Sequence, residues 1–288
     1  MSDRVRVDEV LTSLLNLCTP LEPFDMPLLD AHGATLAEDI YAGERLVMKA
    51  GSRIRSTQIG LAASIGLDHL PTRPHPRVVV LSAGPDLVEP GVALKGEEEY
   101  ETNSWLLTTA VRETGAVAYR VHSIPENEDQ LKDAIEDQMV RADLIIISGE
   151  RHDDSFDLIT RTLQKLGDVS AVEVAIDSSG RHNFGTIGPD KVPVVTLPGD
   201  PIAAYISFEL LVRPMIRTML GTATIHRPSL KAKLEKAISS TTGVRSYVRA
   251  ILSEDGKSVS PLSSQDEQAT LSDANAFIAV PENVTSLE

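Results

Sequence analysis

Three short loops in this sequence combine glycine with polar side chains, the residue types that bind anions or take part in acid–base chemistry. They are "SAGPDL" at 82–87, "SGERHDDSFD" at 148–157 and "LPGDP" at 197–201. Each follows a short apolar run that predicts a buried strand, and ligands in open α/β folds bind at the carboxyl ends of such strands. We therefore expect the three loops to form one cleft. Any one of them alone would more often be a simple chain reversal.

The middle loop begins as a phosphate-binding loop and then becomes acidic. The apolar run "LIIIS" leads into Ser148 and Gly149, where backbone amides and a helix N-terminus would receive an anion. The following residues include Glu150, Asp153 and Asp154. A carboxylate repels each negative charge at 4 Å by about 4 kcal/mol at an effective dielectric constant of about 20. The loop therefore argues against an anionic ligand.

The same acids raise the alternative of a metal site. His152 and the aspartates 153, 154 and 157 are ligands that hard or borderline cations accept. Their spacing matches no known ligand pattern, and charge runs most often face water. We predict a solvated acidic loop and no metal site. The other histidines have no evident acid or nucleophile partner, so no Ser-His-Asp catalysis is predicted.

Composition limits the classes of function. The chain has 288 residues and a formal net charge of −15, a balance that disfavours nucleic acid and anionic lipid as partners. Its apolar runs are far shorter than the roughly 20 residues that cross a bilayer, and the N-terminus has no apolar signal core. The single cysteine, Cys18, excludes an internal disulfide. We expect a cytoplasmic protein without direct membrane insertion.

Proline-rich segments divide the chain into three regions. "LPTRPHPR" (70–77) and "GTATIHRP" (221–228) predict connections, so the expected domains are 1–74, 75–221 and 222–288. In the central region, strand patterns alternate with helix patterns. The strands lie near 77–82, 117–122, 144–148, 171–176 and 192–197, and the helices near 104–114, 126–140, 156–166 and 202–219. This order predicts an α/β fold with a central, mostly parallel sheet and helices on both faces.

Local signals specify the ends of several elements. Asn103 is expected as the N-cap of the first central helix, with Gly115 closing it, and Asp200 with Pro201 suits the start of the last one. The first region opens with an amphipathic helix from Val7 to Leu17 and predicts an α+β module. Short alternating runs after Pro228 predict a small β-domain.

Together these segments resemble a known family. The order of "VVVLSAGPDLVEPG", "YETNSWLLTTAVRETGA", "ADLIIISG" and "VPVVTLPGDPIAAYISFELLVRPMIRTMLG" is similar to that of the MoeA family, the molybdopterin molybdenumtransferases, which includes the E domain of gephyrin. The stretches "PLLDAHGATLAEDIYA" and "MKAGSRIRSTQIGLAASIGL" resemble that family's first domain, and the tail resembles its C-terminal β-domain. The resemblance implies a MoeA-like architecture and a symmetric homodimer. We expect the dimer also because the apolar face of the first helix needs a surface to cover it.

The sequence departs from the family in its domain content and in two loops. An inserted domain that completes the family's cleft from the neighbouring subunit is missing here, near 42–43. Where the family has "STGDEL", Ser82 and Gly84 remain and Asp86 stands for the glutamate, but Pro85 replaces the acid implied in metal insertion. Where the family has "YDSN", Tyr100 and Asn103 remain and Glu101 replaces aspartate, which we interpret as a mild change.

The other departures add negative charge. In place of "SGGVSVGDYD", this chain keeps Ser148, Gly149 and Asp157 but has Glu150 and Asp154 instead of glycines. At the two lysine positions of "KPGKP" it has Asp177 and Gly180. In "LPGDP", which keeps Pro198 and Gly199, Asp200 replaces an asparagine. We interpret these positions as a degenerate ligand cleft without an intact catalytic set.

Two functions of different class follow. The preferred hypothesis is a non-catalytic, homodimeric scaffold that resembles gephyrin and binds a peptide segment of a partner protein, with no cofactor. The alternative is an active transferase that inserts molybdate into molybdopterin or its adenylylated form, for which molybdopterin, molybdate and Mg²⁺ would be required. Another small ligand in a remodelled cleft remains a third option.

Overall fold

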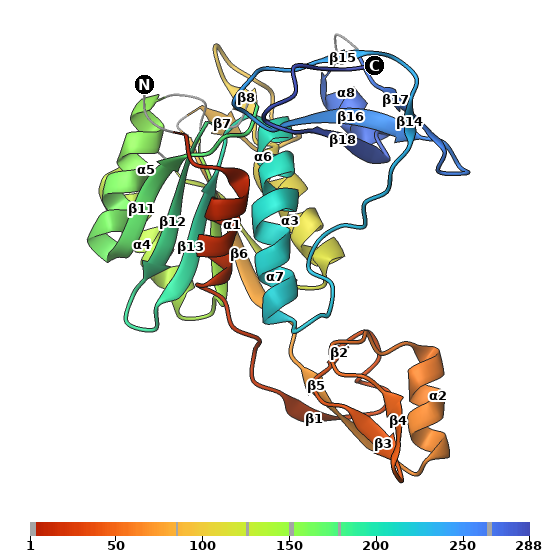
Figure 1. The fold of residues 1–288 in the computed structure, drawn as a ribbon. Helices are drawn as coiled ribbons and strands as arrows, with labels where there is room; N and C mark the ends of the chain where they lie inside the picture. The colour runs from red at the N-terminus through yellow and green to blue at the C-terminus, as the bar shows by residue number, and fades with distance from the viewer. Residues whose placement is uncertain (1–3, 85, 125–126, 150–152, 178–179, 264–266) are drawn as a thin grey trace.

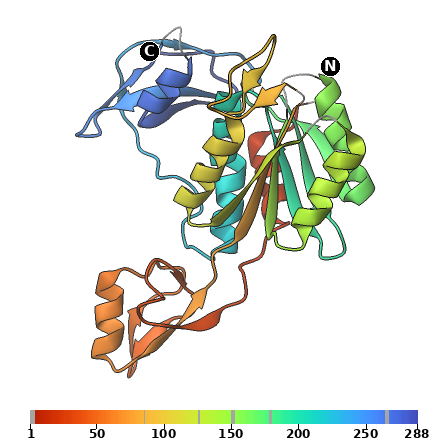
Figure 2. The same ribbon diagram turned by 180° about the vertical axis from the view of Figure 1, so that it is seen from behind.

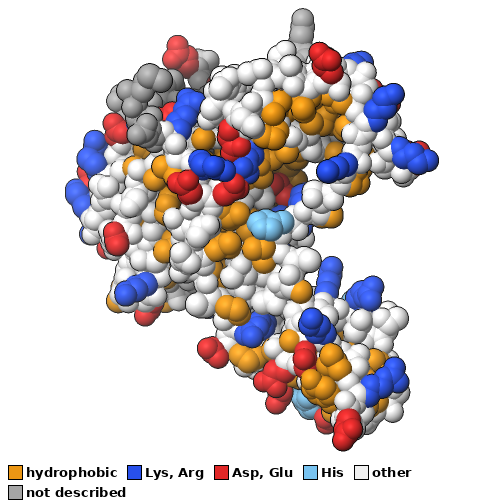
Figure 3. Space-filling model, viewed as in Figure 1, with side chains coloured by type: hydrophobic (Ala, Val, Ile, Leu, Met, Phe, Trp, Pro, Cys, Tyr) orange, Lys and Arg blue, Asp and Glu red, His pale blue; other side chains and the backbone are white. Residues whose placement is uncertain are grey.

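The computed structural model describes residues 4–84, 86–124, 127–149, 153–177, 180–263 and 267–288, excluding the side chains of 122–124, 153, 154 and 267. A central α/β domain carries a C-terminal β-rich unit at one end, and a small first module extends from its other end (Figure 1). A notch separates the C-terminal unit from the first module (Figure 3).

The central sheet has six strands in the order β11-β12-β13-β10-β6-β9. The strands are β6 (Arg77–Ala83), β9 (Val117–Ile124), β10 (Leu144–Ser148), β11 (Gly167–Glu173), β12 (Arg181–Ile187) and β13 (Val192–Leu197). β13, β10, β6 and β9 are parallel, whereas β12 pairs antiparallel with both β13 and β11. The predicted mostly parallel sheet is therefore confirmed, but β12 was not predicted and β11 begins before the expected strand at 171–176.

Alternating side chains of the strands build two cores, one on each face of the sheet. On β6, Val78 and Val80 face one core, whereas Val79 and Leu81 face the other. The first core contacts α1 (Val7–Leu15), α3 (Asn103–Thr114), α6 (Pro201–Ser207) and α7 (Arg213–Met219), and the second contacts α4 (Glu128–Met139) and α5 (Asp153–Leu166). Figure 2 shows the two helical layers on either side of the sheet. Helices on both faces agree with the predicted fold class.

The predicted helix at 202–219 contains a wider turn in its middle. A π-helical segment, η1 (Phe208–Val212), joins α6 to α7. Pro214 lies two residues after the end of this segment, in the first turn of α7. Proline lacks an N–H and its ring clashes with the carbonyl four residues earlier, so a wider turn just before it lets the helix continue.

Helix α1 packs against its own chain. Val7, Val10 and Leu14 are buried in the core that contains Phe208 and Met215 of η1 and α7. The amphipathic pattern was read correctly, but the inference that this face needs a second subunit is wrong, because the central domain of the same chain covers it. The predicted first region therefore contributes its first helix to the central core.

The first module has its own small core. Strands β1 (Phe24–Pro27), β5 (His69–Arg73) and β2 (Thr35–Leu36) form one antiparallel sheet, and β3 (Ile40–Ala42) pairs with β4 (Arg45–Met48) beside α2 (Ser56–Ser64). Leu36, Ile54 and Leu70 are buried together. The expected connection at 70–77 is thus a strand as far as Arg73. Within this strand, the Pro71 carbonyl accepts a hydrogen bond from the N–H of Ala37.

The C-terminal unit is β-rich, as predicted. Its sheet has the order β14-β17-β16-β18, and a second pair joins β15 to β19. The bounds are β14 (Lys233–Leu234), β15 (Ile238–Ser239), β16 (Ser246–Leu252), β17 (Ser258–Pro261), β18 (Ala276–Val280) and β19 (Ser286–Leu287). One helix, α8 (Glu267–Asp273), was not predicted; it contacts α6 of the central domain. Within the described part of the chain, no helix is long and apolar enough to cross a membrane.

We expect Leu14→Ala to lower the free energy of unfolding by about 2–5 kcal/mol, because Leu14 is fully buried in the central core. Chemical denaturation would measure the loss. The control is Ser13→Ala, because Ser13 lies on the exposed face of the same helix. The loss should be the same at all protein concentrations. A concentration-dependent loss would mean that the helix is covered by another subunit.

Candidate functional site

A pocket of about 500 Å³ lies at the carboxyl ends of the parallel strands. Its walls come from the end of β6, the segment 86–102 and the start of α3. The loop after β10, the loop before α6, and helix α8 complete them. It is lined by Ser82, Asp86, Leu87, Glu97, Glu99, Tyr100, Glu101, Thr102, Asn103, Gly149, Gly199, Pro201 and Gln268. The three loops singled out in the sequence thus meet here, represented by Ser82, Gly149 and Gly199.

Asn103 connects two of these loops. Its Nδ2 donates to Ser148 Oγ at 2.7 Å and to the carbonyl oxygen of Gly199 at 2.7 Å. Because a carbonyl can only accept, the Gly199 contact fixes which end of the amide is Nδ2. The sequence predicted Asn103 as the N-cap of α3, but Asn103 is the first residue of the helix and Thr102 precedes it as the cap. Its side chain instead holds the loops around the pocket together.

The N-terminus of α3 is satisfied by Glu101 instead. This carboxylate is only 1% exposed, and its Oε1 accepts from the backbone N–H of Ser104 at 2.7 Å. Its Oε2 accepts from the Ser104 hydroxyl and pairs with Arg120 at 3.4 Å. Glu101, interpreted from sequence as a mild replacement, thus has a structural role that its residue type alone did not indicate.

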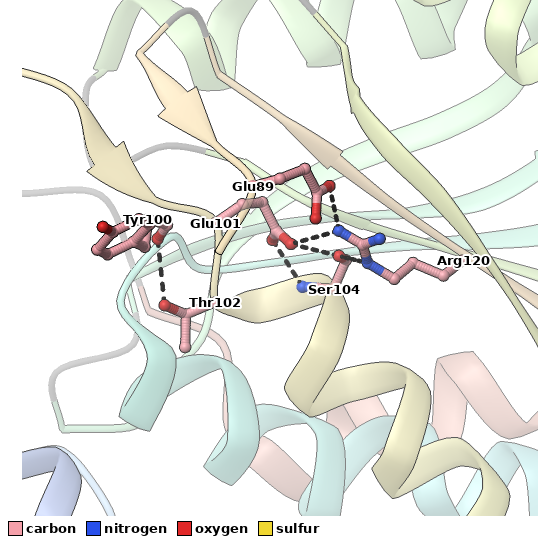
Figure 4. Close-up of polar contacts among 6 residues, drawn as sticks. All are labelled: Glu89, Tyr100, Glu101, Thr102, Ser104 and Arg120. Carbon is pink, nitrogen blue, oxygen red and sulfur yellow. Dashed lines mark hydrogen bonds and ion pairs between the residues drawn. The ribbon is translucent and has the colours of Figure 1, made fainter. Parts of the chain in front are cut away.

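Arg120 of β9 is the centre of this buried network (Figure 4). Its Nη2 pairs with Glu89, and its Nε donates to Ser104 Oγ at 2.6 Å. The guanidinium carbon lies 4.2 Å from the ring centroid of Trp105. Figure 4 also shows Tyr100 directed away from this network. Arg120 could not be predicted from the sequence, because its hydrogen-bond partners lie 16 to 31 positions away along the chain.

The segment that ends in this network forms one wall of the pocket. Two short strands, β7 (Leu87–Val88) and β8 (Glu99–Tyr100), pair in parallel, and Glu89 and Glu101 directly follow them. Four carboxylates line the pocket, and none of its described lining residues is Lys, Arg or His. The side-chain carboxylates of Asp86, Glu97 and Glu99 have no hydrogen bond or ion pair to the described residues. The acidic run "GEEEYE" was the available signal in the sequence, and it was missed.

The remaining predicted site residues lie around or away from the pocket. Asp200 caps α6 by accepting from the N–H groups of Ile202 and Ala203, as expected. Ser148 is fully buried beneath the pocket and also contacts the Pro198 carbonyl. Gly84 does not line the pocket. The expectations on Pro85, Glu150 and the side chain of Asp154 lie outside the described residues.

Two of the predicted acids have partners elsewhere. Asp157 is paired with Arg181 at 3.4 Å, and the Arg181 guanidinium lies over the ring of Phe156. Asp177 accepts from Ser246 Oγ at 3.1 Å, where the central domain meets β16. Neither residue lines the pocket. Asp177 thus connects two parts of the fold, and its expected contribution to the charge of the cleft stays a prediction.

His182 is a core residue of β12. Its Nε2 lies 3.1 Å from Ser207 Oγ, and both side chains are buried. Burial lowers the pKa of His182 to about 4, against a smaller opposite effect of the Gly180 carbonyl. The imidazole is thus neutral in the folded protein. Among the described residues, no group of three or more His, Cys, Asp or Glu side chains is placed to hold a metal ion.

Comparisons with known proteins match this architecture part by part. Residues 79–218 match the family described as "Probable molybdopterin binding domain", and residues 231–288 match "MoeA C-terminal region (domain IV)". The chain belongs to the MoeA family. Two curated relatives from Mycobacterium tuberculosis are molybdopterin molybdenumtransferase 1, 30% identical over 253 residues, and molybdopterin molybdenumtransferase 2, 33% identical over 259 residues.

The MoeA-family chain is shorter than these relatives. The matches cover 85% and 87% of this chain but only 59% and 63% of the two transferases. Among solved structures, a molybdopterin biosynthesis MoeA protein from Pyrococcus has a TM-score of 0.84 at 20% identity, covering 99% of this chain and 96% of that one. A molybdenum cofactor biosynthesis protein from Pyrococcus furiosus has a TM-score of 0.78 at 23% identity, with the same coverage. At these identities, the structural likeness shows the fold alone.

We expect Arg120→Met to destabilise the protein by about 3–5 kcal/mol, because it leaves the buried carboxylate of Glu101 without its cation. Adding Glu101→Gln should recover part of the loss, with a coupling energy of about 1 kcal/mol or more in a double-mutant cycle. Denaturant titrations of the four proteins would measure it. Strict additivity would show that the two side chains do not stabilise each other.

We also expect His182 to make the protein sensitive to acid. Its pKa in the fold is below the ordinary value of about 6.5, so the unfolded chain takes up the proton first and stability falls as pH drops from about 6.5 towards 4. This contribution is about 2 kcal/mol by pH 5. Denaturation at pH 7 and pH 5 should show a smaller loss for His182→Gln than for the natural sequence. The exposed-site control His226→Gln should behave as the natural sequence does.

Proposed function

We propose that this MoeA-family chain is a non-catalytic binding protein, a scaffold that does not itself insert molybdenum. The observation that carries the proposal is the charge of the pocket, which is lined by four carboxylates and by no described Lys, Arg or His. Molybdate and the phosphate of molybdopterin, the substrates that the family resemblance implies, are anions. The described residues of the pocket do not fit them.

The size of the electrostatic effect supports this reading. One carboxylate at 4 Å opposes each negative charge of a ligand by about 4 kcal/mol at an effective dielectric constant of about 20. Asp86, Glu97 and Glu99 have no described partner that would offset their charge, and only Glu101 is paired, with Arg120. Catalysis of anion transfer needs groups that stabilise developing negative charge, and losing one such group typically costs about a hundredfold or more in rate.

The fold at residues 42–43 also supports the proposal. The family resemblance places an inserted, cleft-completing domain at this point. Here β3 ends at Ala42 and β4 begins at Arg45, and the two strands pair directly. Gly43 has a φ of +62°, a left-handed conformation that suits glycine in a tight turn. The chain therefore crosses this junction as a closed hairpin.

The proposed protein is a cytoplasmic homodimer that binds a segment of a partner protein, without a cofactor and without nucleic acid. The apolar face of α1 is covered within the chain and gives no support for a second subunit. The proposed homodimer therefore rests on the family resemblance alone. The net charge of −15 is consistent with a basic or neutral partner.

The alternative is an active molybdopterin molybdenumtransferase. Sequence identity of 30% and 33% to two proteins of that name favours it, as does the retention of a pocket at the strand ends. For the alternative to hold, the anions would have to be bound by groups other than the described lining residues.

Expression of this chain in a strain that lacks its own molybdenumtransferase distinguishes the scaffold from the transferase. We expect no recovery of molybdoenzyme activity from this chain, and full recovery from the mycobacterial molybdopterin molybdenumtransferase 1 as the positive control. Calorimetry with molybdopterin and molybdate should give no binding heat. Restored activity at comparable expression would establish the transferase and end the scaffold proposal.

A further inference from the structure

The strand-end pocket has an excess of hydrogen-bond acceptors over donors. The carboxylates of Asp86, Glu97 and Glu99 are acceptors only and have no described partner. They lie on exposed positions of the wall that runs from β7 to β8. A ligand that pairs with them must bring N–H or O–H groups.

A second, independent feature of the pocket indicates the same kind of ligand. Asn103 lines the pocket and is only 6% exposed, yet its Oδ1 finds no hydrogen-bond donor. The assignment of this oxygen is firm, because Nδ2 is held by the Gly199 carbonyl. Leaving a buried acceptor unpaired typically costs about 1–3 kcal/mol. This oxygen has almost no accessible surface of its own, so a ligand donor has to shift the surrounding groups to reach it, and pairing would then remove this cost.

An exposed aromatic ring completes the lining. Tyr100 is 45% exposed and lines the pocket, and Figure 4 shows it directed away from the Arg120 network. Aromatic faces attract ammonium and guanidinium groups, whereas they offer nothing to a phosphate. The protein's own cation nearby, Arg120, is already engaged with Glu89 and Glu101.

We infer that this pocket binds a ligand carrying ammonium or guanidinium groups, which pair with Asp86, Glu97 and Glu99 and donate to Asn103. The inference rests on the proposed function, because it names the chemistry of the ligand that a non-catalytic cleft would take. Two sources share this chemistry, a Lys- or Arg-rich segment of a partner protein and a free polyamine. A divalent cation is disfavoured, since the described residues include no cluster placed to hold a metal ion.

Calorimetric titration of the full chain at low salt tests the inference. The probes are an acetylated, amidated hexalysine peptide, spermidine, magnesium chloride and potassium phosphate. The fluorescence of Trp105, the single tryptophan, provides a second readout, because its ring lies against Arg120 beside the pocket wall. We expect one or both amines to bind. If hexalysine displaces bound spermidine at a lower concentration than spermidine needs to displace hexalysine, the ligand is a basic peptide segment. If spermidine is the stronger competitor, the ligand is a polyamine.

The pocket variant is Asp86→Asn/Glu97→Gln/Glu99→Gln, and it should weaken amine binding by about tenfold or more. Its matched control, Asp30→Asn/Asp190→Asn/Glu254→Gln, removes the same number of charges from exposed positions that do not line the pocket. The control should weaken binding by less than about threefold, since exposed charges outside the site are screened.

Three results would overturn the inference: no amine binding, equal losses in both triple variants, or tighter binding of phosphate or Mg²⁺ than of the amines. Its failure is distinguishable from that of the proposed function. A chain that binds no amine and restores no molybdoenzyme activity keeps the proposed function and loses only the inferred ligand.

Discussion

The pocket wall depends on Arg120. This one side chain pairs with Glu89, which directly follows β7, and with Glu101, which directly follows β8. The carboxyl ends of both strands are thus fastened to β9 of the central sheet. Without the guanidinium, Glu101 would be a buried charge with only Ser104 as partner, and α3 would lose the ordered carboxylate that satisfies its N-terminus. The position of the wall, and with it the shape of the pocket, follows from this ion-pair network.

The central fold could be predicted because its strands are buried on both faces. The runs that became β6, β10 and β13 are continuously apolar, as expected of parallel strands between two helical layers. β12 escaped prediction because its residues include His182 and Asn183, whose side chains are polar but buried. His182 contacts Ser207, and the Asn183 Oδ1 accepts from the Thr160 hydroxyl. Polar core residues of this kind look like loop residues until their partners, far away in the chain, are known.

The site was harder to predict than the fold because its chemistry depends on long-range pairing. Asn103 is a common N-cap type, and its actual role as a bridge from Ser148 to Gly199 joins positions 45 and 96 residues away. Asp177 was expected at the cleft, yet it bonds to Ser246. In both cases the residue type was informative, but the partner decided the role. The sequence indicated acids at the cleft, including Asp86, but it did not point to Glu97 and Glu99, and the side chains expected at 150–154 lie outside those described.

The acids of the pocket fall into two groups that serve different ends. Glu101 is buried and paired, so its carboxylate mainly holds α3 and Arg120 in place. Asp86, Glu97 and Glu99 are exposed and unpaired among the described residues, so the fold does not require their charge. Surface substitutions at such positions usually change stability by less than about 0.5 kcal/mol. These charges lie on one wall of a pocket that Asn103, with its unpaired amide oxygen, also lines, and a ligand explains them better than stability does. Under the proposed function, the MoeA architecture keeps its pocket while the class of ligand that the pocket accepts changes from anions to hydrogen-bond donors.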